Sequence, residues 1–224
     1  MRPTIIIAAF NETYSIKKVV TTLRRKGYDD IIVVDDGSFD NTSEQAEKAG
    51  AIVLRHIINR GQGAALKTGI DYALLKGSAL LVTFDADGQH NANEIDAMIT
   101  PILNEETDIT LGSRFLGRAT NLPFLKWSVL KIGTFFVYLL YGIKLTDSQN
   151  GFRALSRKSA LQIQITSDRM EHAGEIIGEI RRNKLRYKEV PVTISYTKYS
   201  LGKGQKASAA IALGIRMIIR RFIR

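Results

Sequence analysis

The segment Leu80-Leu81-Val82-Thr83-Phe84-Asp85-Ala86-Asp87-Gly88-Gln89-His90 carries the most informative pattern in the chain. Its short apolar run is typical of a strand buried on both faces. Asp85 and Asp87 stand one residue apart where that strand ends, and their charges repel each other unless a cation lies between them. Carboxylate oxygens, with the side-chain oxygen of Gln89, suit Mg²⁺ or Mn²⁺. The alternative is an Asp-rich turn with solvated carboxylates, but the position directly after a buried strand favours a metal site.

The first half of the chain alternates between such apolar runs and segments with helical spacing. We expect strands over Thr4–Ala9, Asp30–Val34, Ala51–Leu54, Ala79–Phe84 and Asp108–Leu111, and helices over Thr13–Lys26, residues 42–49 and Gly61–Lys76. This alternation predicts an α/β fold with a mostly parallel, Rossmann-like sheet and helices on both faces. Ligands of such sheets bind beyond the carboxyl ends of the strands, so the polar clusters that follow the strands mark the predicted site.

The pattern after residue 111 is less regular. We expect a loop and an apolar helix within Ala119–Lys144, a polar turn over Asp147–Phe152, a helix over Met170–Asn183, an edge or antiparallel strand over Arg186–Ser195, and a polar loop over Thr197–Lys206. The sequence contains no internal repeat and no low-complexity linker. It therefore predicts one domain over residues 1–206, followed by a short appendage over residues 207–224.

The positive charge of the chain is concentrated at its C-terminal end. The formal net charge is +10, and residues 181–224 carry twelve Lys and Arg against one acid. Within Ala207–Arg224, Ile and Phe fall on one side of a helix and Arg on the other, which indicates either a helix lying in an anionic membrane surface or one docked on the core. The apolar run Ile132–Ile143 has 12 residues, fewer than the ~20 needed to cross a bilayer. We therefore expect a peripheral protein without a spanning segment.

Several functional classes are disfavoured by composition and motif. The chain has no cysteine, which excludes disulfides, thiolate metal sites and cysteine nucleophiles. A dehydrogenase is disfavoured because Asn11-Glu12-Thr13 follows the first strand in place of a glycine fingerprint. Nucleic acid is not an expected partner, since aromatic residues do not interleave with the basic ones at the C-terminal end. A basic module that binds membrane or RNA stays the non-enzymatic alternative.

Other polar residues follow the predicted strands and suit a phosphorylated ligand. Glu12 and Asp36 are placed to accept hydrogen bonds from a ribose or a base, although each also fits an ordinary turn. Residues 59–65 (NRGQGAA) open a helix with small residues that would let a nucleotide approach the backbone. Arg114 follows the fifth strand, and its guanidinium suits bidentate binding of phosphate. Asp147 would be the general base if the acceptor were a hydroxyl group.

Taken together, the motifs of the chain resemble those of inverting family-two glycosyltransferases of GT-A fold, in particular the branch of dolichyl-phosphate mannose and glucose synthases. The resemblance covers about residues 4–206. It is carried by seven motifs in order: Ile5–Glu12 (IIIAAFNE), Val33–Ser38 (VVDDGS), Asn59–Gly69 (NRGQGAALKTG), Asp85–His90 (DADGQH), Gly112–Phe115 (GSRF), Asp147–Leu155 (DSQNGFRAL) and Glu189–Ile194 (EVPVTI).

The resemblance implies a role for particular residues. The predicted nucleotide-sugar site consists of Ala8, Phe10, Glu12, Val34, Asp36, Asp85 and Ala86, with Lys203 and Lys206 in a basic loop that closes over the diphosphate. Asp87 and Gln89 would hold the divalent cation with Asp85 nearby, which makes Asp87 a catalytic residue. Arg114 would contact the phosphate of the acceptor or donor. Ala8 and Phe10 stand where the family usually has Pro and Tyr, which alters the edge that stacks on the base.

The predicted activity is the inverting, metal-assisted transfer of a hexose from a GDP- or UDP-sugar to a polyprenyl (dolichyl) phosphate at the cytoplasmic face of the membrane. A phosphate acceptor is already largely anionic at neutral pH, so its attack needs no general base. The alternative is the same fold acting on a hydroxyl of a glycan or small molecule, with Asp147 as the base. The predicted partners are the nucleotide-sugar, the lipid phosphate and an anionic membrane surface reached through the C-terminal helix.

Overall fold

The computed structural model describes residues 2–203. Its elements in chain order are β1 (Thr4–Ala9), α1 (Ile16–Arg25), β2 (Ile31–Asp35), α2 (Thr42–Lys48), β3 (Ile52–Arg55), α3 (Gln62–Leu75), β4 (Leu80–Thr83), a 3₁₀ turn (Ala92–Glu94), α4 (Ile95–Leu103), β5 (Ile109–Thr120), α5 (Phe124–Tyr141), β6 (Arg153–Ser156), α6 (Arg157–Gln162), α7 (His172–Arg182), β7 (Tyr187–Ser195) and α8 (Lys198–Lys203). The predicted C-terminal helix over residues 207–224, and with it the division at residue 206, lies outside the described residues.

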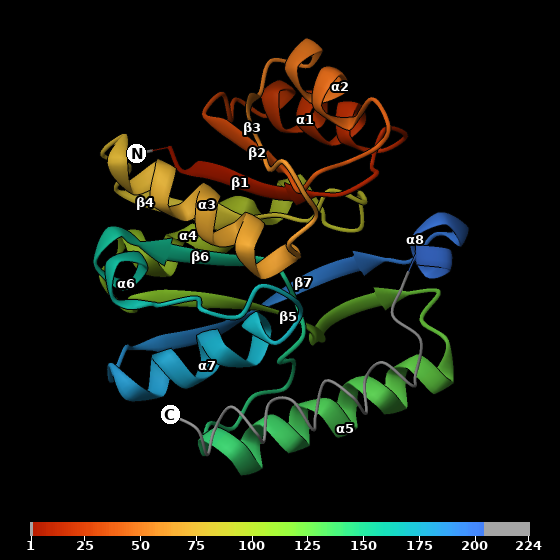
Figure 1. Cartoon of the computed structure of the whole chain (residues 1–224). Helices are drawn as coiled ribbons and strands as arrows, with labels where there is room; N and C mark the ends of the chain where they lie inside the picture. The colour runs from red at the N-terminus through yellow and green to blue at the C-terminus, as the bar shows by residue number, and fades with distance from the viewer. Residues whose placement is uncertain (1, 204–224) are drawn as a thin grey trace.

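The strands form one mixed sheet in the order β3-β2-β1-β4-β6-β5-β7 (Figure 1). All neighbouring pairs are parallel except those that involve β6, which runs antiparallel to both β4 and β5. The prediction of a mostly parallel sheet is therefore confirmed. The carboxyl ends of β1, β2 and β4 lie side by side because these three strands are neighbours.

Helices cover both faces of the sheet, as the continuous apolar strands predicted. Along β1, Ile5 and Ile7 belong to one core cluster and Ile6 to the other, because successive side chains of a strand point to opposite faces. The first cluster takes its helical residues from α1, α2 and α4, and the second takes them from α3, α5, α6 and α7. All three isoleucines are fully buried.

The strands beyond β4 differ from the sequence predictions. β6 was not predicted, because its four residues (RALS) lack the continuous apolar run that marks the equally short β3 and β4. β5 continues to Thr120 instead of ending at Leu111, with a break in its register against β7 between Ser113 and Arg118. The Gly112-Ser113-Arg114 segment looks like the end of a strand, but the strand continues after its register against β7 shifts. β7 lies at the sheet edge as predicted, and it pairs parallel to β5.

The helix α5 is longer than the apolar run predicted from the sequence. It has 18 residues and, of the helices in residues 2–203, is the one that length and composition would allow to cross a membrane. This corrects the prediction that the apolar segment is too short. Its inner side packs on α7, where the Tyr141 ring lies against Gly178, while Phe124, Leu125 and Leu139 are 81%, 69% and 62% exposed. α5 runs along the lower edge of the molecule in Figure 1.

The predicted polar loop over Thr197–Lys206 is also wrong in part, because residues 198–203 form α8. Thr197 starts this helix: its hydroxyl accepts a hydrogen bond from the Ser200 backbone N–H (3.1 Å), and the Ser200 hydroxyl accepts one from the Thr197 N–H (3.0 Å). This reciprocal pair is the arrangement of a capping box, with Ser in place of the usual Glu.

Candidate functional site

The predicted donor residues gather where β1, β2 and β4 end. Glu12 follows β1, and its carboxylate accepts hydrogen bonds from the hydroxyls of Ser15 (2.5 Å) and Tyr199 (2.9 Å). Tyr199 belongs to α8, so this bond brings the C-terminal helix to the end of the first strand. The Tyr199 ring also meets the Tyr14 ring edge-on, with 6.3 Å between centroids. A segment 187 residues away in sequence therefore borders the predicted ribose site.

The two aspartates at the end of β2, Asp35 within the strand and Asp36 after it, hold the surrounding loops. Asp35 is fully buried and accepts a hydrogen bond from the Ser38 N–H (2.9 Å), which makes it structural. The Asp36 carboxylate accepts from the His56 ring (2.7 Å) and from the backbone N–H groups of Arg60 (3.0 Å) and Gly61 (2.6 Å). Gly61 has φ +120°, a conformation that side chains rarely adopt, and it opens α3.

The carboxylate pair after β4 is held from both sides. The Nε2 atom of His90 lies 2.9 Å from Asp85 Oδ2, and the His90 ring packs between Phe84 and Phe152. The ring donates through Nε2 to Asp85, and its buried Nδ1 has no hydrogen-bond partner among residues 2–203. A Cβ at Gly151 would lie 2.5 Å from Asp85 Oδ1, so only glycine fits against this carboxylate. His90 thus positions Asp85.

The electrostatics of this pair suit a divalent cation. Burial and the negative charge of Asp85 raise the pKa of Asp87. Burial opposes the charge of Asp85 too, but His90 and Arg114 hold the pKa of Asp85 below its usual value. Both side chains are partly exposed, and the Gln89 N–H donates to Asp87 (3.0 Å), so the three predicted ligands lie together.

Within residues 2–203 no group of three or more His, Cys, Asp or Glu could hold a metal by itself. If Asp85, Asp87 and Gln89 hold a cation as predicted, its other ligands would come from a bound diphosphate and water, as is common for Mg²⁺.

Arg114 and Asp147 form a buried ion pair beside these carboxylates. Arg114 Nε lies 2.6 Å and its backbone N 3.1 Å from Asp147 Oδ2, and the guanidinium also contacts the Tyr196 hydroxyl. Burial disfavours the charge of Arg114, but Asp147 outweighs it and raises the pKa of Arg114. Arg114 is buried at the point where the register of β5 shifts, and there Ser113 Oγ accepts hydrogen bonds from the N–H groups of Phe115 and Leu116. Asp147 thus holds Arg114 in place.

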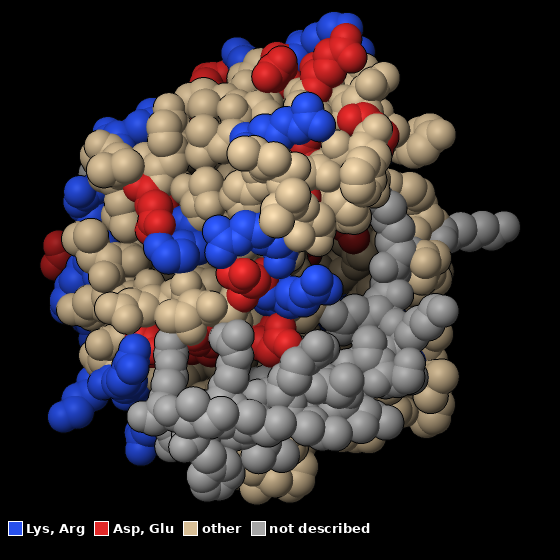
Figure 2. All heavy atoms as spheres, in the orientation of Figure 1, with Lys and Arg blue, Asp and Glu red and all other residues tan. Residues whose placement is uncertain are grey.

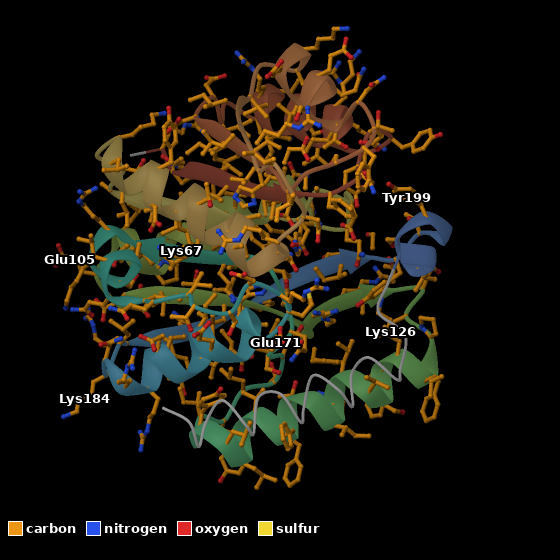
Figure 3. The ribbon with its side chains drawn as sticks, in the orientation of Figure 1. Lys67, Glu105, Lys126, Glu171, Lys184 and Tyr199 are labelled. Atoms are coloured by element: carbon orange, nitrogen blue, oxygen red, sulfur yellow. The ribbon has the colours of Figure 1, made fainter. Side chains whose placement is uncertain are left out.

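A second cation faces the same place from α5. The Lys126 ammonium lies 4.6 Å from the centre of the Tyr196 ring, a cation–π contact. Burial and the neighbouring charge of Arg114 lower the pKa of Lys126, while Asp87 opposes this. Lys126 and Tyr199 lie at the same end of the molecule in Figure 3. The sheet thus brings acidic and basic side chains to one edge.

The order and spacing of these residues match a known family. The sequence model of glycosyl transferase family 2 matches residues 4–163. The chain belongs to glycosyl transferase family 2. It is 40% identical to an uncharacterised protein of Methanocaldococcus jannaschii, over 97% of this chain and 91% of that protein. It is 37% identical to the UDP-N-acetylglucosamine–dolichyl-phosphate N-acetylglucosaminyltransferase of Methanococcus voltae, over 96% of this chain and 94% of that enzyme.

Solved structures show the same fold. The crystal structure of glucosyl-3-phosphoglycerate synthase from Mycobacterium tuberculosis with Mn²⁺ and UDP-glucose superposes with a TM-score of 0.76 at 18% identity, over 98% of this chain and 78% of that one. The predicted GT-A-like fold is therefore confirmed, and the family 2 chain is a glycosyltransferase.

Not every predicted site residue of this family 2 enzyme offers a side chain to a ligand. Val34 is fully buried in the core, which leaves only its backbone for the predicted contact, and Ala86 is 5% exposed. Ala8 is partly buried, and the Phe10 ring is 38% exposed, edge-on to Phe39. The side chain of Lys203 and the whole of Lys206 lie outside the described part of the chain. Their predicted contact with the diphosphate therefore stays a prediction.

Sequence reasoning missed four residues that contact the predicted site residues: His56, Lys126, Tyr196 and Tyr199. None lies in a motif with a chemical signature. Lys126 precedes the apolar run in the sequence, and it belongs to the first turn of α5 because that helix begins at Phe124. Tyr196 and Tyr199 reach the site because β7 ends beside β5 and α8 turns back over β1.

Proposed function

We propose that this glycosyltransferase moves a hexose from a nucleoside diphosphate to a polyprenyl phosphate at a membrane surface, on its cytoplasmic face. One observation carries the proposal. Arg114, fixed by Asp147, and Lys126 place two cations next to Asp85 and Asp87, and Lys126 projects from the helix whose outer face is apolar. A lipid phosphate has the matching parts, an anionic head and an apolar tail.

The outer face of α5 supports the location at a membrane. Phe124 and Trp127 stack with 5.9 Å between ring centroids near the end of the helix that carries Lys126. Aromatic and aliphatic side chains with lysines beside them are typical of helices that lie in the interface of a bilayer. On the face shown in Figure 2, Lys and Arg are interspersed with Asp and Glu instead of forming a uniform positive surface.

The state of Asp147 favours a phosphate over a hydroxyl acceptor. Its side chain is fully buried, and both of its oxygens accept hydrogen bonds from Arg114. A carboxylate used in this way is a poor base. A phosphate needs no base: one of its anionic oxygens attacks the anomeric carbon, the bond from that carbon to the donor diphosphate breaks, and the nucleoside diphosphate leaves with the electron pair. No proton moves in this step.

The donor side follows from the strand ends. Phe10, Glu12 and Asp36 would bind the nucleoside, and Asp85, Asp87 and Gln89 would hold Mg²⁺ or Mn²⁺. When bound, the cation neutralises charge on the leaving diphosphate. The name of the Methanococcus voltae relative, which pairs a UDP-sugar with dolichyl phosphate, supports this combination of substrates.

The test is an assay of the full chain with detergent-solubilised polyprenyl phosphate, labelled UDP- and GDP-sugars, and Mn²⁺ or Mg²⁺. We expect a labelled lipid that forms only with cation present. Dephosphorylated polyprenol is the matched control, since it offers a hydroxyl on the same tail. Product with the alcohol but not with the phosphate would favour the hydroxyl alternative, and no product from any donor would contradict the proposal.

A further inference from the structure

The Asp36 carboxylate is largely committed to bonds within the protein. Its Oδ1 accepts hydrogen bonds from His56 Nδ1 (2.7 Å) and the Arg60 N–H (3.0 Å), and its Oδ2 accepts one from the Gly61 N–H (2.6 Å). The side chain of Asp36 is 4% exposed. Three of the roughly four acceptor positions of a carboxylate are therefore occupied before any ligand arrives.

His56 is fixed in this arrangement by a second element. Its Nε2 lies 3.0 Å from the hydroxyl of Thr68, which belongs to α3. Because an ionised carboxylate only accepts hydrogen bonds, Nδ1 of His56 donates to Asp36, and Nε2 pairs with the Thr68 hydroxyl. The chain Asp36–His56–Thr68 thus ties the end of β2 to α3. The bond to Asp36 cannot be given up by a simple rotation of the ring.

One remaining acceptor position distinguishes between bases. Uracil presents a single N–H between two carbonyl groups, whereas guanine presents two adjacent N–H groups that need both carboxylate oxygens. At Asp36 the second N–H of guanine would be left unpaired in a buried place, which is costly. We infer that the donor of this enzyme is a uridine nucleotide-sugar and not a guanosine one, with His56 as the positioning residue that sets this specificity. The inference rests on the proposed function.

The direct test is calorimetric binding of UDP and of GDP to the full chain, each with Mn²⁺. We expect UDP to bind at least about tenfold more tightly than GDP. Equal affinities, or tighter binding of GDP, would overturn the assignment of the base and leave the proposed function standing. If neither nucleotide bound at millimolar concentration, the proposed function itself would fail.

A pair of variants tests the part played by His56. In His56→Leu the freed position on Asp36 can accept a second N–H, so the ratio of the two affinities should fall to within about threefold. In His56→Asn the amide nitrogen lies close to where Nδ1 was, and the ratio should be retained. A merely structural role would weaken both nucleotides alike and leave the ratio unchanged. That result in folded His56→Leu would contradict the inference.

Ile57→Ala is the matched control, because the Ile57 side chain is fully exposed next to His56. The ratio of its affinities for UDP and GDP should equal that of the unchanged protein. Circular dichroism and the thermal midpoint establish that each variant is folded. If His56→Leu does not fold, the ratio measured on the unchanged protein still decides the base.

Discussion

The two halves of the sheet build their parts of the site in different ways. On the donor side, β1, β2 and β4 are parallel neighbours, and each places its acidic residues at its own carboxyl end. On the side that we propose binds the acceptor, called the acceptor side below, Arg114 depends on Asp147, 33 residues away, and on Tyr196, 82 residues away. The donor side is thus a property of local segments, whereas the acceptor side exists only once distant segments have packed.

The largest effect should come from the donor side. In Asp87→Asn one of the two carboxylates is lost, and with it the charge that holds the cation. We expect turnover to fall about 10³-fold, measured as labelled lipid formed at saturating donor. Asp71→Asn, which removes an exposed carboxylate paired with Lys67, is the control. Loss of less than tenfold in Asp87→Asn would mean that the carboxylate pair does not hold a functional cation.

The acceptor side should respond next. Arg114→Lys keeps the positive charge but loses the planar guanidinium, which donates hydrogen bonds to both Asp147 and Tyr196. We expect about a 10²-fold loss in kcat/KM for the polyprenyl phosphate, with the affinity for UDP unchanged. Arg118→Lys, an exposed position in the same strand, should behave like the unchanged protein. If Arg114→Lys weakened UDP binding as much as it lowered kcat/KM for the polyprenyl phosphate, Arg114 would not act on the acceptor alone.

The outer face of α5 can be tested with the single tryptophan of the chain, Trp127. It is 42% exposed, so transfer from water into a bilayer interface should shift its fluorescence to shorter wavelength when anionic vesicles are added. The double variant Phe124→Ser/Leu125→Ser should bind vesicles about 30-fold more weakly. Phe39→Ser, 91% exposed at the donor side, is the control. If Phe39→Ser lost as much vesicle affinity as the double variant, the outer face of α5 would not be the membrane-binding surface.

The bond between α8 and β1 links the two halves. Tyr199→Phe removes the hydrogen bond to Glu12 while keeping the ring contact with Tyr14. We expect the KM for the donor to rise about tenfold with little change in kcat, because α8 is then held less firmly at the ribose site. A lower KM would show instead that Tyr199 competes with the ribose for Glu12.

The smallest effect should be a pH dependence of stability that originates at Glu175 in α7, beside the loop that packs on the start of α3. Burial alone would raise the pKa of Glu175, but hydrogen bonds from Thr166 and Ser167 outweigh it and lower this pKa. A lowered pKa in the folded state gives stability that is present above the unfolded pKa of about 4.3 and is lost as the pH falls through the folded value.

In denaturant unfolding, the free energy of unfolding should therefore fall by about 1 kcal/mol between pH 6 and pH 3. We expect Glu175→Gln not to show this fall. An equal loss in the variant would assign the effect to other carboxylates.

Much of the donor side was predictable from the sequence. The strand Thr4–Ala9 has the bounds expected, and the acids after β1, β2 and β4 were expected to meet because parallel strands end at one edge. What local patterns could not show was that His56 would occupy Asp36 or that His90 would hold Asp85. Each of those contacts depends on the orientation of a single ring.

The acceptor side was decided by tertiary structure. β6 has no apolar run of the kind that marks β3 and β4. The polar residues after Leu111 look like the end of a strand, but β5 continues because β7 pairs with it beyond the register shift. The sequence by itself determined the parallel half of the sheet and its row of carboxylates, since burial pattern and strand direction are local. Packing alone determined that Arg114 is held by Asp147 and faced by Lys126, since ion pairs between distant segments leave no periodic signal in a chain.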